Sequence, residues 1–277
     1  MEWTCPTCNK LSSTRYCPTC GESPVSPREY TLSGLAGRLV QAFTSIDTKT
    51  ARSVWTLVRR PGELTVSWMK GVRKVYVAPI TLFLLVNALF FAVQSVTGGA
   101  VFSSPLDSHL NHQDWSAFSR SLVQQKLQTT GLSLDSYTVA FNSAVAIHAK
   151  SLIILMTVPF AFLLPMVFVH ARRPFMAHVV FSLHLYALLL LLFCVALFLA
   201  SASAWLGFGG LETPAVDKVL SVVNLAVGGL YIYASIGPVY GTSGGWRALQ
   251  TALLAIAMAA IVIGYRFSLF LITVLTT

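Results

Sequence analysis

Five long apolar runs dominate the chain after residue 76. They cover residues 77–96, 151–169, 179–204, 218–237 and 251–275. A membrane-spanning helix needs about 20 mostly apolar residues to cross a hydrocarbon core of roughly 30 Å, and a longer run can tilt. The pattern therefore predicts an all-α polytopic membrane protein, with about five transmembrane helices in a bundle over residues 77–277.

Residues 23–76 have a different pattern. Apolar residues recur there at helical spacing, but polar and charged residues separate them too closely for a span. Pro61 and Gly62 divide the segment, because proline followed by glycine interrupts a helix. We predict a short linker followed by amphipathic, interfacial helices on the membrane surface, with Trp55 and Trp68 at headgroup depth.

One long polar segment, residues 97–150, separates the first two spans. Its pattern predicts two short helices, near 113–129 and 134–149, and the second should run into the second span. Within that span, Pro159 and Pro165 should kink the helix, because proline cannot donate the backbone hydrogen bond that continues it.

The composition excludes an ordinary soluble protein. Of the 277 residues, 55% are hydrophobic and only 10% are charged, whereas about 25% are charged in a typical soluble domain. The mean hydropathy is +0.69. A soluble fold cannot bury that much apolar surface, so lipid must cover part of it.

The placement of charge predicts the orientation. Residues 1–76 hold eleven Lys and Arg and five Asp and Glu, and they contain no secretory signal sequence. The loops around 170–173 and 238–250 carry three more arginines, so fourteen of the nineteen basic residues fall on one side. The positive-inside rule assigns that side to the cytoplasm. We expect a bacterial inner-membrane protein with a cytosolic N-terminus, an extracytoplasmic loop 97–150 and an extracytoplasmic C-terminus.

Membrane lipid is the partner that this charge favours, because basic residues beside a span attract anionic headgroups. Nucleic acid is the weaker interpretation, since the charges alternate with apolar residues rather than forming a run. The basic residues expected at the membrane surface are Arg59, Arg60, Lys70, Arg73, Lys74, Arg172 and Arg173.

Residues 1–22 carry a metal-site pattern. Cys5 and Cys8 form one CxxC pair, and Cys17 and Cys20 form another after eight intervening residues. Two such turns complete a tetrahedral four-sulfur site, which favours a structural zinc ion in a small zinc-ribbon-like knuckle. Iron and a redox dithiol are the alternatives. Four thiolates leave no open position for catalysis, so the functional possibility is that the knuckle docks a cytosolic protein.

Polar residues within the spans are further candidates, because a polar side chain in lipid must face protein or water. Asn87 and Gln94 share a face of the first span. Asn224 and Tyr231 belong to a stripe on the fourth span that also includes Ser221, Gly228 and Ser235. Helix packing is the favoured interpretation, and a ligand-lined cavity is the alternative.

Four ionisable residues are also candidates: His170, His178, His184 and Arg266. The histidines lie near the predicted cytosolic ends of the second and third spans, where packing is favoured over a metal or proton-relay role. Arg266 can either face the bundle and pair with an acid, or extend toward the outer surface, which we favour.

Several segments resemble an uncharacterised family of bacterial inner-membrane proteins. They are the cysteine segment, the stretch RSVWTLVRRPGELTVSWMKGVRKVYVAPITLFLLVNALF, and the later AHVVFSLHLYALL and VYGTS. The family pattern "rPG…GkR..Y..P" is matched by Arg60, Pro61, Gly62, Gly71, Arg73, Tyr76 and Pro79, and "H..FslH" by His178, Phe181, Ser182 and His184. The resemblance covers most of the chain and implies the same architecture. It also implies that residues 60–79, His178 and His184 matter for function, but it brings no biochemical activity.

Three functions remain open. The leading hypothesis is a non-enzymatic protein whose knuckle and basic interfacial helices engage a cytosolic partner or the inner leaflet. It follows from the closed metal site and from the absence of a recognisable catalytic motif. The second is a small-molecule or lipid transporter lined by Asn87, Gln94, Asn224 and Tyr231. The third is a lipid-modifying enzyme that uses His178, His184 and the Arg172-Arg173 pair.

Overall fold

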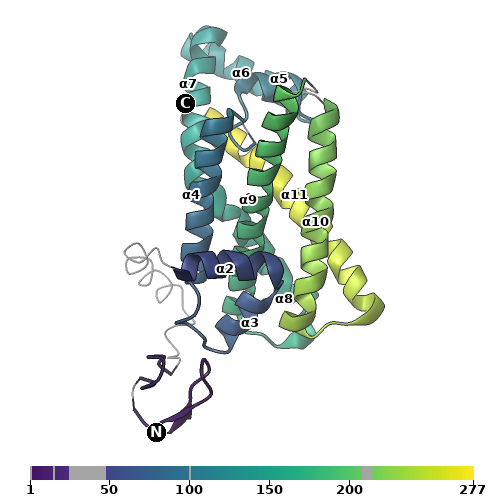
Figure 1. Cartoon of the computed structure of the whole chain (residues 1–277). Coiled ribbons are helices and arrows are strands. Elements are labelled where there is room, and N and C mark those ends of the chain that lie inside the picture. Colours follow the sequence, from purple (N-terminus) through teal and green to yellow (C-terminus); the bar gives the residue numbers. More distant parts are fainter. Residues whose placement is uncertain (1, 15, 25–47, 100, 208–213) are drawn as a thin grey trace.

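The computed structural model describes residues 2–14, 16–24, 48–99, 101–207 and 214–277. It is a multi-pass membrane protein with five helical spans, as the apolar runs predict (Figure 1). The amino and carboxyl ends of the chain lie at opposite ends of the bundle. We call these the knuckle end and the cap end. The spans cover Pro79–Thr97, Leu134–Val167, Phe175–Ala204, Lys218–Tyr240 and Gly244–Thr276.

Helix α9 (Phe175–Trp205) is the centre of the bundle. It packs against α4 (Pro79–Thr97), α8 (Thr157–Val167) and α10 (Pro214–Tyr240), while α11 (Gly244–Thr276) crosses the bundle obliquely (Figure 1). Consistent with this position, α9 is the most buried of the five spans. An apolar helix that meets protein on most sides needs no polar face, which explains its nearly continuous hydrophobic sequence.

The second span begins earlier than the apolar run suggested, at Leu134 rather than 151. Its first part is α7 (Leu134–Leu152), which starts where the Ser133 side chain accepts a hydrogen bond from the Ser136 backbone N–H. A 3-10 turn, η2 (Ile153–Met156), then joins α7 to α8. Pro159 follows this turn and cannot donate to the carbonyl of Leu155, so the chain tightens without ending the helix.

Segment 101–133 forms a cap over one end of the bundle. It contains α5 (Leu106–Asn111), which the sequence pattern did not predict, and α6 (Ser116–Thr130). Their apolar side chains form a second core with α7 and the end of α11, including Leu106, Val123, Phe141 and Phe270. This core is separate from the main one, so the cap is a packed layer rather than an open loop.

At the opposite end, α2 (Thr48–Arg59) lies across the spans, and α3 (Glu63–Met69) packs against both α9 and α10 (Figure 1). Trp55 on α2 is 62% exposed, as an interfacial position requires. Trp68 on α3 is only 6% exposed and belongs to the main core. Its position differs from the expected headgroup depth because α3 inserts between spans instead of resting on the surface. The short linker expected after the knuckle and the part of the interfacial segment expected before residue 48 lie outside the described residues, apart from Ser23 and Pro24.

Candidate metal centre and its attachment to the bundle

The knuckle consists of two backbone turns with the same hydrogen-bonding pattern. In the first, Cys5 N–H donates to the Lys10 carbonyl and Asn9 N–H to the Cys5 carbonyl; in the second, Cys17 N–H donates to Glu22 and Gly21 N–H to Cys17. The fifth residue of each turn has a positive φ, 57° at Asn9 and 70° at Gly21. Glycine and asparagine are the residues that tolerate this conformation best. A two-stranded hairpin, β1 (Trp3–Thr4) and β2 (Leu11–Ser12), flanks the first turn.

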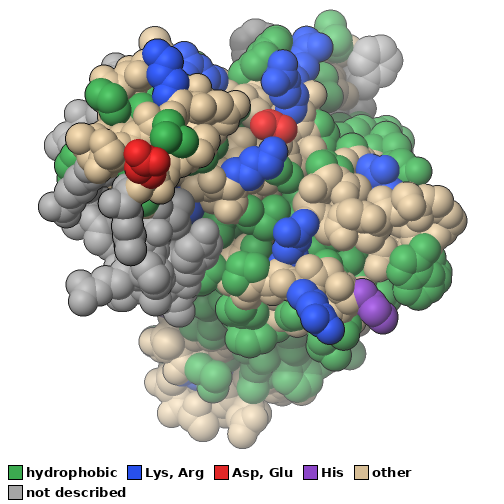
Figure 2. All heavy atoms as spheres, turned by 90° about the horizontal axis from the view of Figure 1, so that it is seen from below, with side chains coloured by type: hydrophobic (Ala, Val, Ile, Leu, Met, Phe, Trp, Pro, Cys, Tyr) green, Lys and Arg blue, Asp and Glu red, His purple; other side chains and the backbone are tan. Residues whose placement is uncertain are grey.

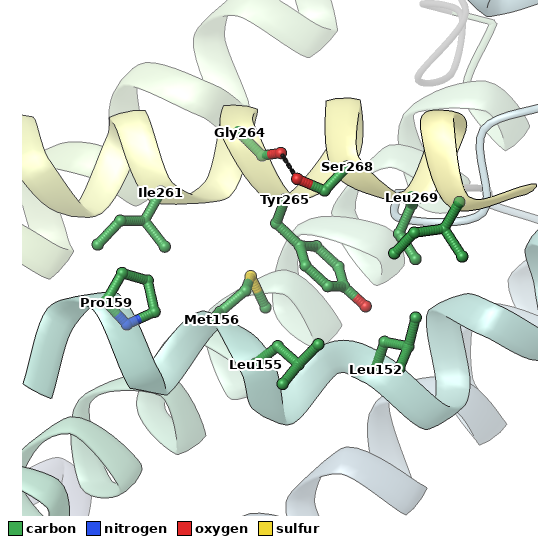
Figure 3. A pocket seen from close by; sticks show the side chains of 10 residues that line it. Leu152, Leu155, Met156, Pro159, Ile261, Gly264, Tyr265, Ser268 and Leu269 are labelled. Atoms are coloured by element: carbon green, nitrogen blue, oxygen red, sulfur yellow. Dashed lines mark hydrogen bonds between the residues drawn. The ribbon is translucent and has the colours of Figure 1, made fainter. Parts of the chain in front are cut away.

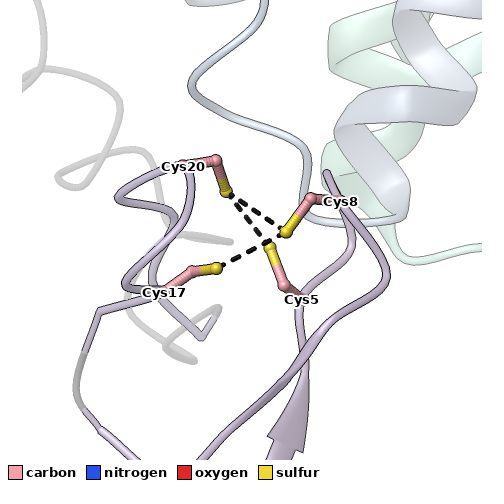
Figure 4. Close-up of side chains that lie close together, drawn as sticks. All are labelled: Cys5, Cys8, Cys17 and Cys20. Carbon is pink, nitrogen blue, oxygen red and sulfur yellow. Dashed lines mark hydrogen bonds between the residues drawn. The ribbon is translucent and has the colours of Figure 1, made fainter.

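The two turns bring the four cysteine sulfur atoms together (Figure 4). All four lie within 4.8 Å of one another. Three of the separations are 3.4 Å (Cys5–Cys20), 3.5 Å (Cys8–Cys17) and 3.8 Å (Cys8–Cys20). A tetrahedron with Zn–S bonds of about 2.3 Å has S···S edges of about 3.8 Å. The cluster therefore fits a four-coordinate metal ion, as the CxxC spacing predicts, and the part of the chain that the structure describes holds no other such group.

The knuckle prepares one of these thiols for metal binding. Burial raises the pKa of the Cys17 thiol, but hydrogen bonds from the backbone N–H groups of Cys20 and Thr19 and from the Cys8 and Cys20 thiols lower it more, to about 6. Metal ligation requires the thiolate form. At neutral pH, Cys17 thus favours the form that binds a cation.

A buried carboxylate attaches the knuckle to the membrane bundle. Glu22 is 1% exposed. Its Oε2 atom accepts hydrogen bonds from Thr7 Oγ1 at 2.8 Å and from the backbone N–H groups of Arg73 and Lys74, each at 3.0 Å. A buried carboxylate must find donors of this kind to offset its lost hydration. The contact joins the first CxxC turn to the segment that precedes the first span.

Basic side chains spread over the knuckle end, with few acidic ones among them (Figure 2). Arg59 and Arg60 are exposed, as are Lys70 and Lys74 at the end of α3 and the Arg172-Arg173 pair. Two of the predicted basic residues stack on aromatic rings: Arg59 lies 4.7 Å from the centroid of Trp55, and Arg73 lies 4.6 Å from that of Trp68. Arg73 is half-buried and also donates to the Trp68 carbonyl.

Two of the three predicted histidines are buried, and they bond to different elements. His184 Nδ1 lies 2.8 Å from Thr65 Oγ1 on α3, and His178 Nδ1 lies 2.9 Å from the Tyr240 hydroxyl on α10. Tyr240 also stacks on both His178 and Phe168. The structure does not bring the two histidines into one site, because they join α9 to two different neighbours. The third, His170, is exposed.

The four residues proposed to line a passage lie on two helices with α9 between them (Figure 1). Gln94 Nε2 donates to Ser103 Oγ at 3.0 Å, while the side-chain oxygens of Asn87 and Gln94 are buried without a hydrogen-bond partner. On α10, Asn224 is half-buried and Tyr231 is buried. Gly228 of the same stripe lies against α11 so closely that a Cβ atom would be 2.8 Å from Met258 Cε. Its position is that of a packing residue.

Arg266 reaches the cap. Its Nη2 donates to Ser104 Oγ at 3.1 Å. Close by, His109 is 1% exposed and stacks on Phe270 at 4.8 Å, and its Nδ1 accepts a hydrogen bond of 3.3 Å from Trp115 Nε1. Burial, with a smaller contribution from the Arg266 charge, lowers the pKa of His109 to about 4. The cap is therefore organised around a neutral histidine that sequence analysis did not single out.

An apolar groove of about 270 Å³ lies between the second span and α11 at the η2 turn (Figure 3). Its two polar side chains bond to the protein itself: Ser268 Oγ donates to the Gly264 carbonyl at 2.8 Å, and the Tyr265 hydroxyl to the Ala149 carbonyl at 3.1 Å. These bonds leave no unpaired side-chain donor for a hydrophilic solute. The remaining lining is aliphatic: Leu152, Leu155, Met156, Pro159, Ile261, Leu269 and Ile272.

Glu22 and Thr65 are the site residues that the sequence did not reveal. Glu22 directly follows the CPTCG motif and looks like a surface charge, and Thr65 lies in a short polar helix. Their partners are 51 and 119 residues away in the chain. A signal was available for Glu22, because a charged residue beside a metal ligand often supports the metal site.

Comparison with known proteins adds one partial match. A family model described as a protein of unknown function (DUF3667) matches residues 47–91. This stretch comprises α2, α3, the Arg73–Lys74 segment and most of α4, and it supports the resemblance to an uncharacterised family that the PG…GVRKVYVAP segment suggested. No curated protein and no solved structure is significantly similar to the chain. The matched residues are thus those that connect the cysteine knuckle to the first span and to α9.

Proposed function

We propose that this protein is a non-enzymatic protein of the bacterial inner membrane, whose zinc knuckle and basic interfacial helices engage a cytosolic partner or the inner leaflet. The observation that carries the proposal is the Glu22 contact with Arg73 and Lys74. It holds a four-cysteine module against the basic end of a membrane bundle. A knuckle attached in this way presents its remaining surface in a defined orientation.

The exposed surface of the knuckle suits a protein partner. Leu11, which follows the exposed Lys10 in the chain, is 66% exposed, and Tyr16 is 54% exposed. Exposed aromatic side chains are enriched at protein interfaces, and charged side chains are typical of the polar rim around them. The metal ion is structural in this proposal, because four thiolates fill its coordination sphere.

The outer face of α2 suits the inner leaflet. Lys49, Arg52, Trp55 and Arg59 are exposed along it. Basic residues around an exposed tryptophan are typical of helices that lie among anionic headgroups. This assignment places the knuckle end in the cytosol and the cap outside the membrane, in agreement with the positive-inside rule.

Site-specific photocrosslinking in native membranes tests the docking surface. A photoreactive phenylalanine analogue in place of Tyr16 should crosslink to one cytosolic protein. A Cys17→Ser variant that still inserts into the membrane should lose that adduct, because the knuckle needs its metal to fold. The matched control carries the same analogue in place of Phe118, an exposed aromatic residue on the cap that is 49% accessible.

An adduct that forms from both positions, or that survives Cys17→Ser, would contradict docking by the knuckle. Metal analysis of the purified protein tests the ion separately, and we expect one zinc per chain. Iron in its place would refute the choice of metal, and the crosslinks would still test the docking surface.

Reporter fusions at the two termini test the orientation in the membrane, with a cytosolic N-terminus and an extracytoplasmic C-terminus expected.

A further inference from the structure

The Glu22 carboxylate accepts hydrogen bonds from two parts of the molecule, the cysteine knuckle and the segment that follows α3. Thr7, one of its three donors, lies inside the first CxxC turn. The Glu22 backbone carbonyl accepts the Cys17 N–H at 2.6 Å, which closes the second turn. The position of this carboxylate therefore depends on the folding of the cysteine cluster, and a knuckle of this size depends on its metal for folding.

The other two donors belong to the end of the α3 segment. Gly71 N–H donates to the Trp68 carbonyl and Val72 N–H to the Ser67 carbonyl, so residues 71–74 directly continue the last turn of α3. Arg73 strengthens this connection through its guanidinium group, which covers the Trp68 ring and donates to the Trp68 carbonyl. A change in the position of this segment would therefore also disturb α3.

Helix α3 is in turn fitted tightly into the bundle. A Cβ atom on Gly62, its N-cap residue, would lie 2.9 Å from the Ser235 carbonyl oxygen and 3.0 Å from Pro238 Cγ on α10. Thr65 bonds to His184 on α9. A continuous set of contacts thus runs from the cysteines through Glu22, the Arg73–Lys74 amides and α3 to two of the membrane-spanning helices.

We infer that metal binding at the knuckle and the insertion of α3 between α9 and α10 are thermodynamically coupled through Glu22. Glu22 acts as a positioning residue for the metal site, although it is not one of the four cysteine ligands. Coupling between two sites is reciprocal. Loss of the metal therefore loosens α3 in the bundle, and loosening the Arg73–Trp68 contact weakens metal binding. The inference rests on the proposed metal ion but on no particular partner.

Competition with a chelator tests the metal side of the coupling in the full-length protein in nanodiscs. Glu22→Ala removes the acceptor, and we expect it to weaken zinc binding by about 10- to 100-fold, the usual effect of removing a residue that supports metal ligands. Glu22→Gln, which keeps one acceptor oxygen, should restore part of the affinity. Glu2→Ala is the control, because Glu2 is an exposed acidic residue of the same module.

A variant on the bundle side separates coupling from a purely local effect. Arg73→Ala leaves the whole knuckle sequence unchanged, and we expect it to weaken zinc binding as well. Lys74→Ala should not, because the Lys74 side chain is exposed and only its backbone N–H contacts Glu22. Unchanged zinc affinity in Arg73→Ala would overturn the coupling even if Glu22→Ala misfolds.

Hydrogen exchange measured by mass spectrometry provides the reciprocal readout. Removing zinc from the wild-type protein should accelerate exchange in residues 60–76 and leave the cap helix 116–130 unchanged. Equal exchange with and without metal would also overturn the inference. A wild-type protein that binds no zinc would instead refute the proposed metal ion, so the two failures are distinguishable.

Discussion

The Arg247 guanidinium donates a 3.1 Å hydrogen bond to the Ala234 carbonyl, four residues before Pro238. Proline at 238 has no N–H, so it leaves that carbonyl without its usual helical partner. Arg247 Nε also donates to the Tyr233 carbonyl at 2.7 Å, and the guanidinium lies 4.2 Å from the Tyr233 ring centroid. A residue at the start of α11 thus completes the hydrogen bonding of α10 near the membrane surface.

Replacing Arg247 by glutamine should destabilise the protein by about 1–3 kcal/mol, because a shorter side chain leaves the Ala234 carbonyl unpaired. The effect is measured as the unfolding midpoint in detergent, with the folded fraction after heating determined by size-exclusion chromatography. Gly237→Ala should have a similar effect, since its Cβ atom would lie 2.7 Å from the guanidinium carbon.

The Arg247 and Gly237 substitutions should be less than additive, because both remove the same contact. Gly245→Ala is the control, as a Cβ atom there meets nothing within 4 Å. Full additivity of the Arg247 and Gly237 changes would show that Gly237 matters for another reason.

Gly62→Ala should destabilise the protein by about 2–4 kcal/mol, through both a φ of +85° and a clash with the backbone of α10. Gly98→Ala separates the two effects. Its φ is +70° but its Cβ atom meets open space, so we expect only about 1 kcal/mol. Equal losses in the two variants would mean that α3 does not approach α10 as closely as the structure shows. The measurement is again the unfolding midpoint in detergent.

Thr65→Val should destabilise the protein by about 1–3 kcal/mol, because it leaves the buried His184 ring without its hydrogen-bond partner. Thr65→Ser keeps the hydroxyl and should recover most of that loss. Both variants are compared by thermal unfolding, and similar stability of Thr65→Val and wild type would argue against the His184 contact.

The hypothesis of a lipid-modifying enzyme is tested by the lipid profiles of cells that carry His178→Ala. We expect no change in lipid composition.

The stability of the cap should fall as the medium is acidified, because of His109. The pKa of this buried histidine is about 4 in the folded protein, against about 6.5 for an exposed one. The unfolded state therefore binds the proton more readily between these values. The stability is fully present above pH 6.5 and decreases progressively toward pH 4, by at most about 3 kcal/mol.

Unfolding midpoints measured from pH 4 to 7 test this dependence. His109→Gln should flatten the profile, because glutamine does not titrate but can still accept the Trp115 hydrogen bond. His112→Gln should leave the pH dependence of the unfolding midpoint unchanged, because the His112 side chain is 70% exposed. A profile unchanged by His109→Gln would assign the acid sensitivity to another group.

Features that depend on local sequence were predictable. The five spans follow from apolar length, since a helix in lipid satisfies all its backbone hydrogen bonds within itself. The cysteine cluster follows from the two CxxC pairs, because each turn determines where its own two sulfur atoms point. The helix over residues 134–149 and its continuation into the second span were predictable too, although the apolar run that begins at residue 151 does not by itself mark the start of that span at Leu134.

What the sequence alone determined is therefore the set of spans and the four cysteines. The six-residue spacing of His178 and His184 already predicted that they do not share a helix face. Only the tertiary structure decided that Trp68 is buried, which helices the two histidines meet and that Glu22 meets Arg73 and Lys74. These features arise from pairs of residues far apart in the chain, and hydrophobic periodicity contains no information about which distant elements meet. A charge beside a cysteine and a threonine in a short helix look ordinary until the packing of α3 between α9 and α10 supplies their partners.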